Sequence, residues 1–450
     1  MAVWSKINYS RINLFQRFDG EFYKPEYEMI FDKLSSNEAL PLRHFISELT
    51  DGKHGGVTYA KNGVKFIRNQ NIKDGFVSSD DIRFISEQES AESLRAELKP
   101  DDLVITTIGT LGEVAIVPED FGRATINQNL VRLCSKKINP HYLAVFLMSD
   151  YGRKQIIRLA SGNVQPIIVY PNLKKVYIFD ANEQIQNEIG CALKNAIQVL
   201  NEAKVAYTQA QQLLEFELGL DKLRIDKPVG YTARFSVTSL ADTFDASRID
   251  AQCFSPEAVF YEDWLLKHTK YDRLSALLSN TAKGRQQTEV EDGPTDYCSI
   301  KHISGREIIG ASKAKPISGT PNATKNDLLL AITGATIGKI GIVNRYDNLV
   351  FSGDMLRMRA NNEISPHYLL LTLDHHLGQV QFNRWITGST NGHLAPRDIG
   401  RVLVPRLLPE KENRISVLVA ESLEKRQESE MLLDQAKFRV EQLIEEAVQR

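Results

Sequence analysis

The chain has 450 residues, 42% of them hydrophobic and 25% charged, which suits two or three soluble globular domains. The net charge of −2 at pH 7 gives no overall sign of a nucleic-acid partner, and no apolar run approaches the roughly 20 residues that cross a bilayer. The first residues lack the apolar core of a signal peptide, and the four cysteines form no CxxC pair. We therefore expect a cytoplasmic protein with reduced thiols and no zinc site.

The first half of the chain begins as a mixed globule. Short β-like runs, such as those at 64–70 and 102–109, predict strands. The hexamer INPHYL at 138–143 opens a helix-like stretch, and a loop rich in Gly, Ser and Asn follows at 161–166. This order predicts an α+β domain over residues 1–181.

A long helix is predicted next, over residues 182–220, because this segment contains no proline. Its apolar positions recur at alternating steps of four and three residues, which is the 3.5-residue period of a coiled-coil face. A helix packed only on its own globule is the alternative, but the seam is long for a small domain. The predicted seam contains Ile185, Ile189, Ala192, Ala196, Val199, Ala203, Ala206, Ala210 and Leu213.

The second half repeats the first. The hexamer returns as ISPHYL at 364–369, which is 364 − 138 = 226 residues later, and Asp102–Ile105 returns as Asp327–Leu330, at 327 − 102 = 225. Ordered matches of this kind indicate an internal duplication. They predict a second α+β domain over residues 221–409 and a second long helix over 410–450. The seam of that helix contains Ile415, Val419, Ser422, Arg426, Ser429, Leu433, Ala436, Val440, Leu443 and Ala447.

Charge differs between the globules and the long helices. Residues 182–220 hold five acidic and two basic residues, and residues 410–450 hold ten acidic and seven basic residues. Each helix therefore carries −3, which leaves −2 + 6 = +4 for the rest of the chain. Mildly cationic globules suit contact with phosphates, whereas anionic helices do not.

Two segments resemble binding motifs without meeting their requirements. Gly334–Lys339 has three residues between its glycines and no Ser or Thr after Lys339, so a tight turn between strands is expected rather than a P-loop. His375 and His376 have only Asp374 near them as a further ligand, so a surface helix end is expected rather than a metal site. No GxSxG, HExxH or EF-hand motif occurs, and we predict no catalytic residues.

Polar side chains that can contact base edges gather in the predicted loops of both globules. Arg pairs with guanine, and Asn or Gln pairs with adenine, in the major groove. Solvated loops are the alternative for any single residue, but repetition in two globules favours DNA reading. The loops differ between the halves while the hexamers correspond, which predicts two different half-sites. The candidate DNA-binding residues are Lys53, His54, Arg68, Asn69, Gln70, Asn127, Gln128, Ser161, Asn163 and Gln165 in the first half, and Lys283, Arg285, Gln286, Lys301, His302, Ser389, Thr390, Asn391 and His393 in the second.

Over essentially its whole length, the chain resembles the specificity subunits of Type I restriction–modification enzymes. The resemblance rests on the repeat, the segments DLVITTIGTLGEVAIV (102–117) and DLLLAITGATIGKIGIV (327–343), the two hexamers, the glycine-containing loops and a long helix after each half. It implies two α+β target-recognition domains joined by two long helices, which form an antiparallel coiled coil with pseudo-two-fold symmetry. Each domain would read one half of a bipartite, asymmetric site in double-stranded DNA, and the helices would set the spacer.

The resemblance also implies partner proteins. The helices would dock two modification subunits, and restriction subunits would join the complex. Adenine methylation from S-adenosylmethionine, and cleavage that needs ATP and Mg, would reside in those partners, so this chain is expected to be no enzyme and to bind no cofactor, metal or membrane. The loop after the hexamer helix and the polar segments at 67–71 and 299–303 are expected to face DNA. The coiled-coil and partner residues would be Ile185, Ile189, Val199, Leu213, Ile415, Val419, Leu433 and Val440.

Three alternatives stay open. A specificity subunit of a related methylation-only or Type IIB-like system would have the same architecture. A protein-binding scaffold on a coiled-coil rod would show no sequence-specific DNA binding. An enzyme with an unusual site would show activity in the isolated chain, and one carboxylate substitution would abolish it.

Overall fold

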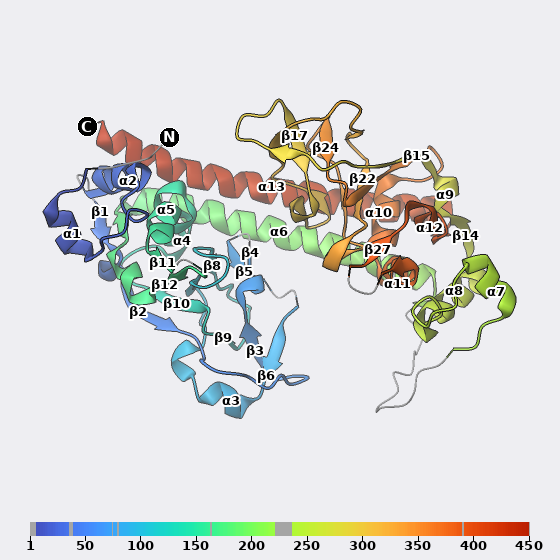
Figure 1. The fold of residues 1–450 in the computed structure, drawn as a ribbon. Helices are drawn as coiled ribbons and strands as arrows, with labels where there is room; N and C mark the ends of the chain where they lie inside the picture. The colour runs from blue at the N-terminus through green and yellow to red at the C-terminus, as the bar shows by residue number, and fades with distance from the viewer. Residues whose placement is uncertain are drawn as a thin grey trace. The chain divides into compact units, whose positions relative to one another are not determined.

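The computed structural model describes residues 6–35, 39–73, 75–78, 81–162, 164–220, 236–388 and 391–449 (Figure 1). The chain divides into two compact units. The first unit contains residues 1–201 and 425–450, and the second contains residues 202–424. Each unit combines helices with β-sheets and includes part of both long helices. The predicted domain boundaries, which separate each globule from its helix, stay a prediction.

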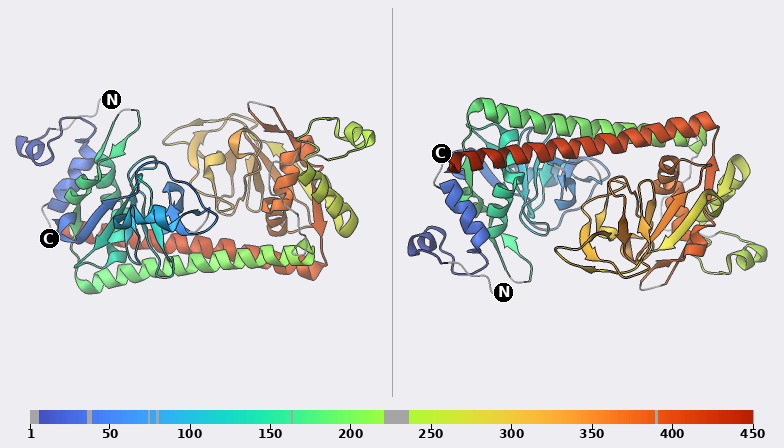
Figure 2. Two further views of the ribbon diagram at one scale, coloured as in Figure 1. Left: turned by 90° about the horizontal axis from the view of Figure 1, so that it is seen from below. Right: turned by 90° about the horizontal axis from the view of Figure 1, so that it is seen from above.

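Both predicted long helices are present, as α6 (Glu183–Glu217) and α13 (Pro409–Val448). In each unit a segment of α6 lies beside a segment of α13 (Figure 2). In the first unit the Ser429 hydroxyl donates to the Ala196 carbonyl at 2.6 Å, and in the second the Ser422 hydroxyl donates to the Ala203 carbonyl at 2.7 Å. A serine hydroxyl reaches a carbonyl of the neighbouring helix only where small side chains let the two backbones approach closely. The Ala and Ser residues of the seam allow this approach.

The apolar seam of α6 differs from the prediction at alternate positions. Ile189, Ala196, Ala203, Ala206 and Ala210 are buried as predicted, whereas Ile185, Ala192, Val199 and Leu213 are only half-buried. The side chains buried instead are Leu193, Leu200, Tyr207 and Leu214. These neighbours follow the same seven-residue spacing and are larger on average, so turning them inward removes more apolar area from water. In α13, Ile415, Val419 and Val440 are buried as predicted, and Leu433 is half-buried.

The first unit contains a six-stranded sheet with the order β2-β10-β7-β8-β5-β4 and a three-stranded sheet with the order β6-β3-β9. Its strands are β1 (Ala39–Pro41), β2 (Ile46–Asp51), β3 (Val64–Ile67), β4 (Ile72–Lys73), β5 (Phe76–Val77), β6 (Arg83–Ile85), β7 (Leu103–Thr106), β8 (Val114–Ile116), β9 (Ala124–Ile126), β10 (Leu130–Ser135), β11 (Ala160–Ser161), β12 (Ile167–Ile168) and β13 (Tyr177–Phe179). Its other helices are α1 (Tyr9–Phe15), α2 (Pro25–Ser35), α3 (Glu87–Ala91), α4 (Pro140–Met148) and α5 (Asp150–Arg158), with short 3-10 turns η1 (Leu42–His44), η2 (Asn69–Asn71), η3 (Leu94–Ala96) and η4 (Tyr170–Lys175).

The second unit contains a six-stranded sheet with the order β15-β25-β22-β23-β19-β18 and a five-stranded sheet with the order β16-β20-β17-β24-β21. Its strands are β14 (Lys270–Arg273), β15 (Leu278–Lys283), β16 (Thr288–Glu289), β17 (Thr295–Cys298), β18 (Ile303–Ser304), β19 (Glu307–Ile308), β20 (Ser312–Lys315), β21 (Asn322–Ala323), β22 (Leu328–Ala331), β23 (Ile340–Ile342), β24 (Leu349–Phe351), β25 (Met355–Ala360), β26 (Ile386–Thr387), β27 (His393–Leu394) and β28 (Leu403–Arg406). Its other helices are α7 (Leu240–Ala246), α8 (Pro256–His268), α9 (Leu274–Leu277), α10 (Pro366–Asp374), α11 (His376–Trp385) and α12 (Pro396–Ile399), with 3-10 turns η6 (Ile300–His302) and η7 (Gly334–Thr336).

The two six-stranded sheets have the same strand order. Replacing β2, β10, β7, β8, β5 and β4 by β15, β25, β22, β23, β19 and β18 converts one sheet into the other. The parallel pair β3 and β9 also recurs, as β17 and β24. The duplication indicated by the sequence therefore extends to strand order.

The repeated hexamers begin equivalent helices, α4 and α10. The Asn139 side chain accepts from the amide of His141 at 2.9 Å, and the Ser365 hydroxyl accepts from the amide of His367 at 3.2 Å, so each hexamer supplies its own helix cap. Each hexamer tyrosine is buried, and its hydroxyl donates to a carbonyl of the last strand before the long helix. Tyr142 donates to Phe179 at 2.8 Å, and Tyr368 donates to Pro405 at 2.9 Å. The hexamer recurs because it caps a helix and fixes that helix to a strand.

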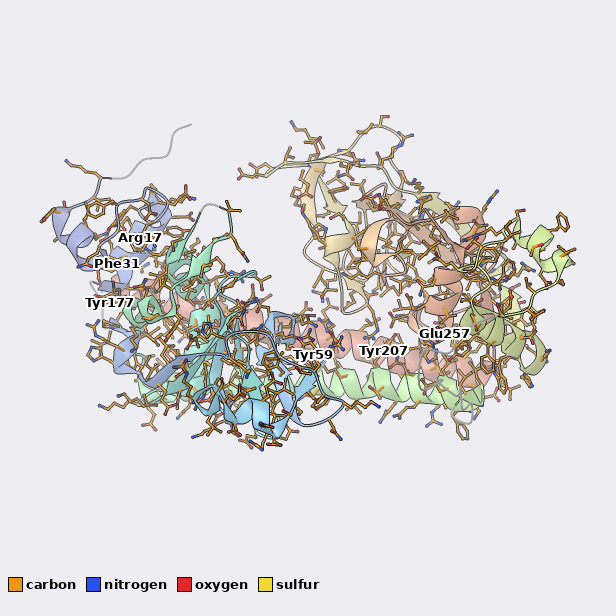
Figure 3. All side chains as sticks on the ribbon, turned by 60° about the horizontal axis from the view of Figure 1, so that its bottom comes forward. Arg17, Phe31, Tyr59, Tyr177, Tyr207 and Glu257 are labelled. Carbon is orange, nitrogen blue, oxygen red and sulfur yellow. The ribbon has the colours of Figure 1, made fainter. Side chains whose placement is uncertain are left out.

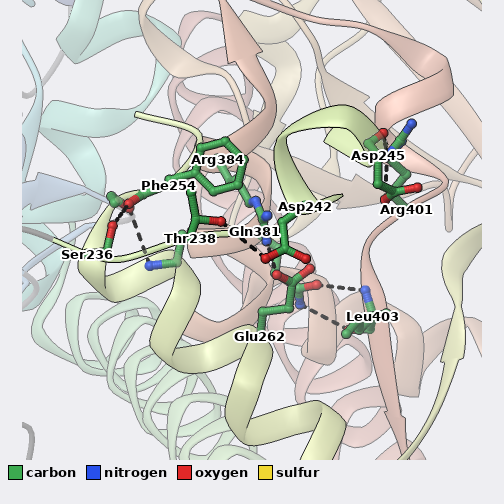
Figure 4. Close-up of polar contacts among 12 residues, drawn as sticks. Ser236, Thr238, Asp242, Asp245, Phe254, Glu262, Gln381, Arg384, Arg401 and Leu403 are labelled. Atoms are coloured by element: carbon green, nitrogen blue, oxygen red, sulfur yellow. Dashed lines mark hydrogen bonds and ion pairs between the residues drawn. The ribbon is translucent and has the colours of Figure 1, made fainter. Parts of the chain in front are cut away.

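The helix after each hexamer helix is tied to the same strand. In the first unit Gln155 exchanges two hydrogen bonds, both 2.9 Å, with the backbone of Tyr177, whose ring meets Phe31 of α2 edge to face at 5.3 Å (Figure 3). In the second unit Gln381 makes the equivalent pair with Leu403, at 3.0 and 2.7 Å (Figure 4). These buried amides hold α5 and α11 in place.

A buried aspartate precedes a central strand of each sheet. Asp102 accepts from Arg132 Nε at 2.5 Å, and Asp327 accepts from Arg359 Nε at 2.7 Å. By the sequence repeat Arg132 corresponds to Arg357, but the arginine that pairs with Asp327 is Arg359, two residues further along the strand. Residues two apart on a strand lie on the same face, so the ion pair can form from either position.

Candidate nucleic-acid interface

Five loops of the first unit contact one another in a chain. A β-bridge joins Lys53 to Asn127, and the Thr107 amide donates to the Asn129 carbonyl at 2.8 Å. The Asn69 side chain donates to the Ile108 carbonyl, and Ile108 forms a β-bridge with Ile167. We call residues 52–54, 68–71, 107–113, 127–129, 161–162 and 164–168 the first loop cluster.

The second unit builds the equivalent arrangement. The Arg285 amide donates to the Phe351 carbonyl at 3.0 Å, and the Ser352 amide donates to the Cys298 carbonyl at 2.8 Å. A β-bridge joins Thr333 to His393. We call residues 284–287, 299–302, 332–339, 352–354, 386–388 and 391–394 the second loop cluster. The described residues among those predicted to read DNA therefore meet in one cluster in each unit, with Lys283 directly before the second.

Neighbouring carboxylates hold several predicted residues of the first loop cluster. Lys53 is only 7% exposed, and its ammonium lies 2.6 Å from the Glu92 carboxylate. Arg68 donates to the carbonyl of Asp81 at 2.8 Å, and the Gln70 side chain donates to the Asp81 carboxylate at 2.5 Å. These contacts stabilise the loop conformations, and the carboxylates of Glu92 and Asp81 compensate the positive charges of Lys53 and Arg68.

Other predicted residues of the first loop cluster face solvent. Gln128, Ser161 and Gln165 are exposed, and Asn127 is half-buried. An exposed glutamine carries both a donor and an acceptor, which is what a bidentate contact with adenine requires. His54 is exposed but lies 2.6 Å from the Asp51 carboxylate. Asn163 lies outside the described residues.

The second loop cluster, together with Lys283 directly before it, has more exposed cationic groups. Lys283, Arg285 and Gln286 are all exposed, and Arg285 makes one long bond of 3.4 Å to the Ser318 carbonyl. Arg285 and Gln286 present the donors and acceptors that contact guanine and adenine. Lys301 is exposed and lies 3.0 Å from the Glu289 carboxylate.

His302 has a supporting position instead. Burial lowers the pKa of His302, so its Nδ1 stays an acceptor for the Ser299 amide at 2.9 Å. Asn391 is exposed and His393 is half-buried, whereas Ser389 and Thr390 lie outside the described residues.

The sequence did not single out the aspartate that closes the second loop cluster. Asp354 accepts from the Thr333 hydroxyl at 2.6 Å and from the Ser352 hydroxyl at 3.2 Å, and its own carbonyl accepts from the Ile332 amide at 2.9 Å. The carbonyl of its counterpart Asn129 accepts from the Thr107 amide at 2.8 Å and from the Thr107 hydroxyl at 3.1 Å. The one available signal was the alignment of Asn129 with Asp354 in the repeat.

The glycine-rich segment from Gly334 to Lys339 is a turn between β22 and β23, as predicted. Gly334 and Gly338 have φ values of 79° and 91°, in the left-handed region that favours glycine. The counterparts Gly109 and Gly112, at 86° and 73°, form the same turn between β7 and β8. The backbone of this turn, and not a phosphate loop, explains the glycines.

The paired histidines lie at the start of α11. His375 is 3.0 Å from the Glu215 carboxylate, and His376 is 3.0 Å from the Glu257 carboxylate. The part of the chain that the structure describes contains no group of three His, Cys, Asp or Glu side chains placed to hold a metal ion. Among the same residues, no helix has both the length and the apolar character needed to cross a bilayer.

Residues 47–206 match the family described as the Type I restriction modification DNA specificity domain. The chain is 26% identical over 135 residues to the Type I restriction enzyme EcoBI specificity subunit of Escherichia coli, a match that covers 29% of this chain and 27% of that protein. It is also 26% identical over 176 residues to the MjaVIII specificity subunit of Methanocaldococcus jannaschii, covering 37% of this chain and 41% of that protein. The matches therefore span less than half the length of either relative. They confirm the resemblance predicted from the sequence.

Solved structures to which this chain is similar include the S subunit of a Type I restriction–modification system from M. genitalium. That similarity has a TM-score of 0.41 and 15% identity, and it covers 90% of this chain and 94% of the other. The HsdS subunit from Thermoanaerobacter tengcongensis has a TM-score of 0.29 and 11% identity, with 91% and 95% of the two chains covered. The resemblance to the specificity subunits rests on the sequence matches.

Proposed function

We infer that this chain, whose residues 47–206 belong to the Type I restriction modification DNA specificity domain family, is the DNA-recognition subunit of a restriction–modification complex. The observation that carries this proposal is the pair of loop clusters. The two units have sheets with the same strand order and loops in equivalent places, yet the exposed side chains of those loops differ. A repeated frame with divergent loops suits two readers of unlike sequences.

Each loop cluster reads one half of a bipartite, asymmetric site. The first loop cluster exposes Gln128 and Gln165, which favours contact with adenine. The second exposes Arg285 and Gln286, with Lys283 beside them, which favours guanine, adenine and the phosphate backbone. The two half-sites are therefore expected to differ in composition.

The long helices form an antiparallel coiled coil that sets the unread spacer. Within the second unit the antiparallel order is supported by Lys411, which lies 2.8 Å from Glu217, and by Ser422, which contacts Ala203. As residue numbers rise along α13, those of the α6 partners fall. Duplicated domains on such helices acquire a pseudo-two-fold axis, which suits half-sites about one helical turn, ~34 Å, apart.

Partner subunits carry the chemistry. Two modification subunits dock on the helices and methylate adenine with S-adenosylmethionine, and restriction subunits use ATP and Mg for cleavage. Large apolar side chains exposed on α6 and α13 support docking, because a partner protein would remove their apolar area from water. They are Val205, Phe216, Val417, Met431 and Phe438.

A substitution in one cluster tests the proposal. In the complex with its modification partners, Gln165→Ala is expected to relax the preference at a base pair of one half-site, by about 1–3 kcal/mol, and to leave the other half-site unchanged. Gln184→Ala, at an exposed position on α6, is the matched control and changes neither. Methylation of a randomised DNA library by each variant measures both half-sites at once. A loss of preference in both half-sites, or in neither, would contradict the assignment of Gln165.

The helices are tested by their length. An insertion of four residues within 200–210 is expected to change the spacer and to leave both half-site sequences as they were. An altered half-site with an unchanged spacer would refute the proposed role of the helices.

A further inference from the structure

A β-hairpin of each unit rests on helix α6. In the first unit this hairpin is β4–β5, and a Cβ built on its turn residue Gly75 would lie 3.2 Å from Met148 Sδ and 3.4 Å from Leu193 Cδ1. In the second unit the hairpin is β18–β19. The Gly75 carbonyl accepts from the Ile116 amide at 3.0 Å, and the Arg306 carbonyl accepts from the Ile342 amide at 2.9 Å. Arg306 therefore occupies the place that Gly75 has in the first unit.

Arg306 makes a charged contact where Gly75 makes an apolar one. Its Nε donates to the Asp374 carboxylate at 2.6 Å, and its guanidinium carbon lies 3.8 Å from the centroid of the Tyr207 ring. The Tyr207 hydroxyl donates to the same carboxylate oxygen at 2.8 Å, from the α6 position labelled in Figure 3. Burial raises the pKa of Tyr207, and the Asp374 carboxylate raises it further, so the phenol keeps the proton that it donates. We call these three residues the hairpin clamp.

The backbone of Arg306 makes this contact notable. Its φ is 70°, in the left-handed region, where Gly75 has 81°. A residue with a Cβ is disfavoured there, and glycine is the usual occupant of such a turn. A side chain kept in an unfavourable conformation points to a role that outweighs the strain.

The first unit contains an equivalent contact with which the hairpin clamp can be compared. Asp374 corresponds to Met148, since 374 − 148 = 226, and Tyr207 follows Leu193 by 207 − 193 = 14 residues, which is two heptads of α6. Leu193 and Tyr207 are both buried. The equivalent hairpins therefore contact the same heptad position of α6, through an apolar contact in the first unit and a charged one in the second.

The hairpin is continuous with residues expected to face DNA. Strand β18 begins directly after η6, which contains Lys301 and His302, and β4 begins directly after η2, which contains Asn69 and Gln70. We propose that Arg306, Asp374 and Tyr207 are positioning residues that fix the second recognition domain on α6 and thereby determine how strictly the complex requires one spacer length. This inference rests on the proposed function and deepens it.

The test measures spacer preference with the full chain and its modification partners. The probe is a plasmid library that carries both half-sites at spacers from shorter to longer than the preferred one. Arg306→Gly restores the residue that the first unit has, relieves the backbone strain and removes the clamp, so the protein is expected to fold. The measured quantity is the ratio of methylation at the preferred spacer to methylation at neighbouring spacers. This ratio is expected to be about tenfold smaller than in the unaltered chain, a loss equivalent to 1.4 kcal/mol.

Two further variants make the result specific. Asn326→Gly relieves a φ of 72° at an exposed turn in the same unit without touching the clamp, and it is expected to leave the spacer preference unchanged. The triple variant Arg306→Gly, Tyr207→Leu, Asp374→Met copies the apolar seat of the first unit and is expected to recover the strict preference.

The outcomes separate this inference from the function beneath it. If the unaltered complex methylates a bipartite site with one spacer and Arg306→Gly does the same with equal strictness, the clamp has no positioning role. If Asn326→Gly broadens the preference as much as Arg306→Gly does, relief of strain and not the clamp is responsible, which also overturns the inference. If the unaltered complex has no bipartite site, the proposed function itself fails.

Discussion

Two adjacent leucines of α6 give a direct test of the seam. Leu214 is 0% exposed within the second unit, whereas Leu213 is half-buried against the same core. Because Leu→Ala at a fully buried site removes the transfer free energy of the side chain and leaves a cavity, Leu214→Ala is expected to cost about 2–5 kcal/mol. Leu213→Ala removes the same atoms from a partly wet site and is expected to cost about 1 kcal/mol.

Chemical denaturation with tryptophan fluorescence measures this difference. Trp264 and Trp385 both belong to the second unit, so their emission reports on the unit that contains both leucines. The two variants differ only in which neighbour is shortened, and each serves as the control for the other. Equal losses of unfolding free energy would show that Leu213 is buried as fully as Leu214, and a larger loss for Leu213→Ala would show that the seam runs through Leu213; either result would refute the observed phase of α6.

Three other predictions follow from buried groups. Asp102→Asn leaves the buried Arg132 without its main counter-charge, so unfolding of the first unit is expected to need about 3–5 kcal/mol less, measured by urea denaturation, with exposed Asp120→Asn as control. Burial lowers the pKa of His141 and His367, so the unfolded chain takes up protons that the folded chain cannot. The free energy of unfolding is therefore expected to fall as pH drops from about 7 to about 5.5. The double variant His141→Gln, His367→Gln should flatten this pH profile, and an unchanged profile would exclude these histidines as its cause. A Cβ on Gly378 would lie 2.5 Å from the Leu373 carbonyl oxygen, so Gly378→Ala should lower the denaturation midpoint well below that of Gly310→Ala, which has open space around it but a φ of 63°.

The parts of the fold that follow from local pattern could be predicted from the sequence. Proline-free segments with a 3.5-residue period gave α6 and α13 within a few residues, and the glycines at 334 and 338 gave a turn between strands. The phase of α6 was wrong at alternate positions because Ala192 and Leu193, or Leu213 and Leu214, are adjacent apolar residues with the same spacing. Only the packing of the globule and α13 decides which of each pair turns inward.

The candidate site was harder to predict because exposure and pairing depend on residues far apart in the chain. The loops were chosen by composition, and they do meet in one cluster in each unit. Lys53 was chosen as a cation, yet its partner Glu92 is 39 residues away and has no pattern that links it to Lys53. His302 was chosen as a polar residue and supports a turn instead. Tyr207 and Arg306 were not chosen, since a tyrosine in a helix seam and an arginine in a turn carry no local signal.

We propose that this chain directs a modification complex to one bipartite site. Sequencing of adenine methylation in the host genome, with and without the gene for this chain, is the decisive experiment. Loss of the gene is expected to remove methylation at one asymmetric motif with two half-sites and a fixed spacer. A methylation pattern that stays unchanged while the chain and its modification partners are expressed would exclude this role and favour a scaffold that does not read DNA.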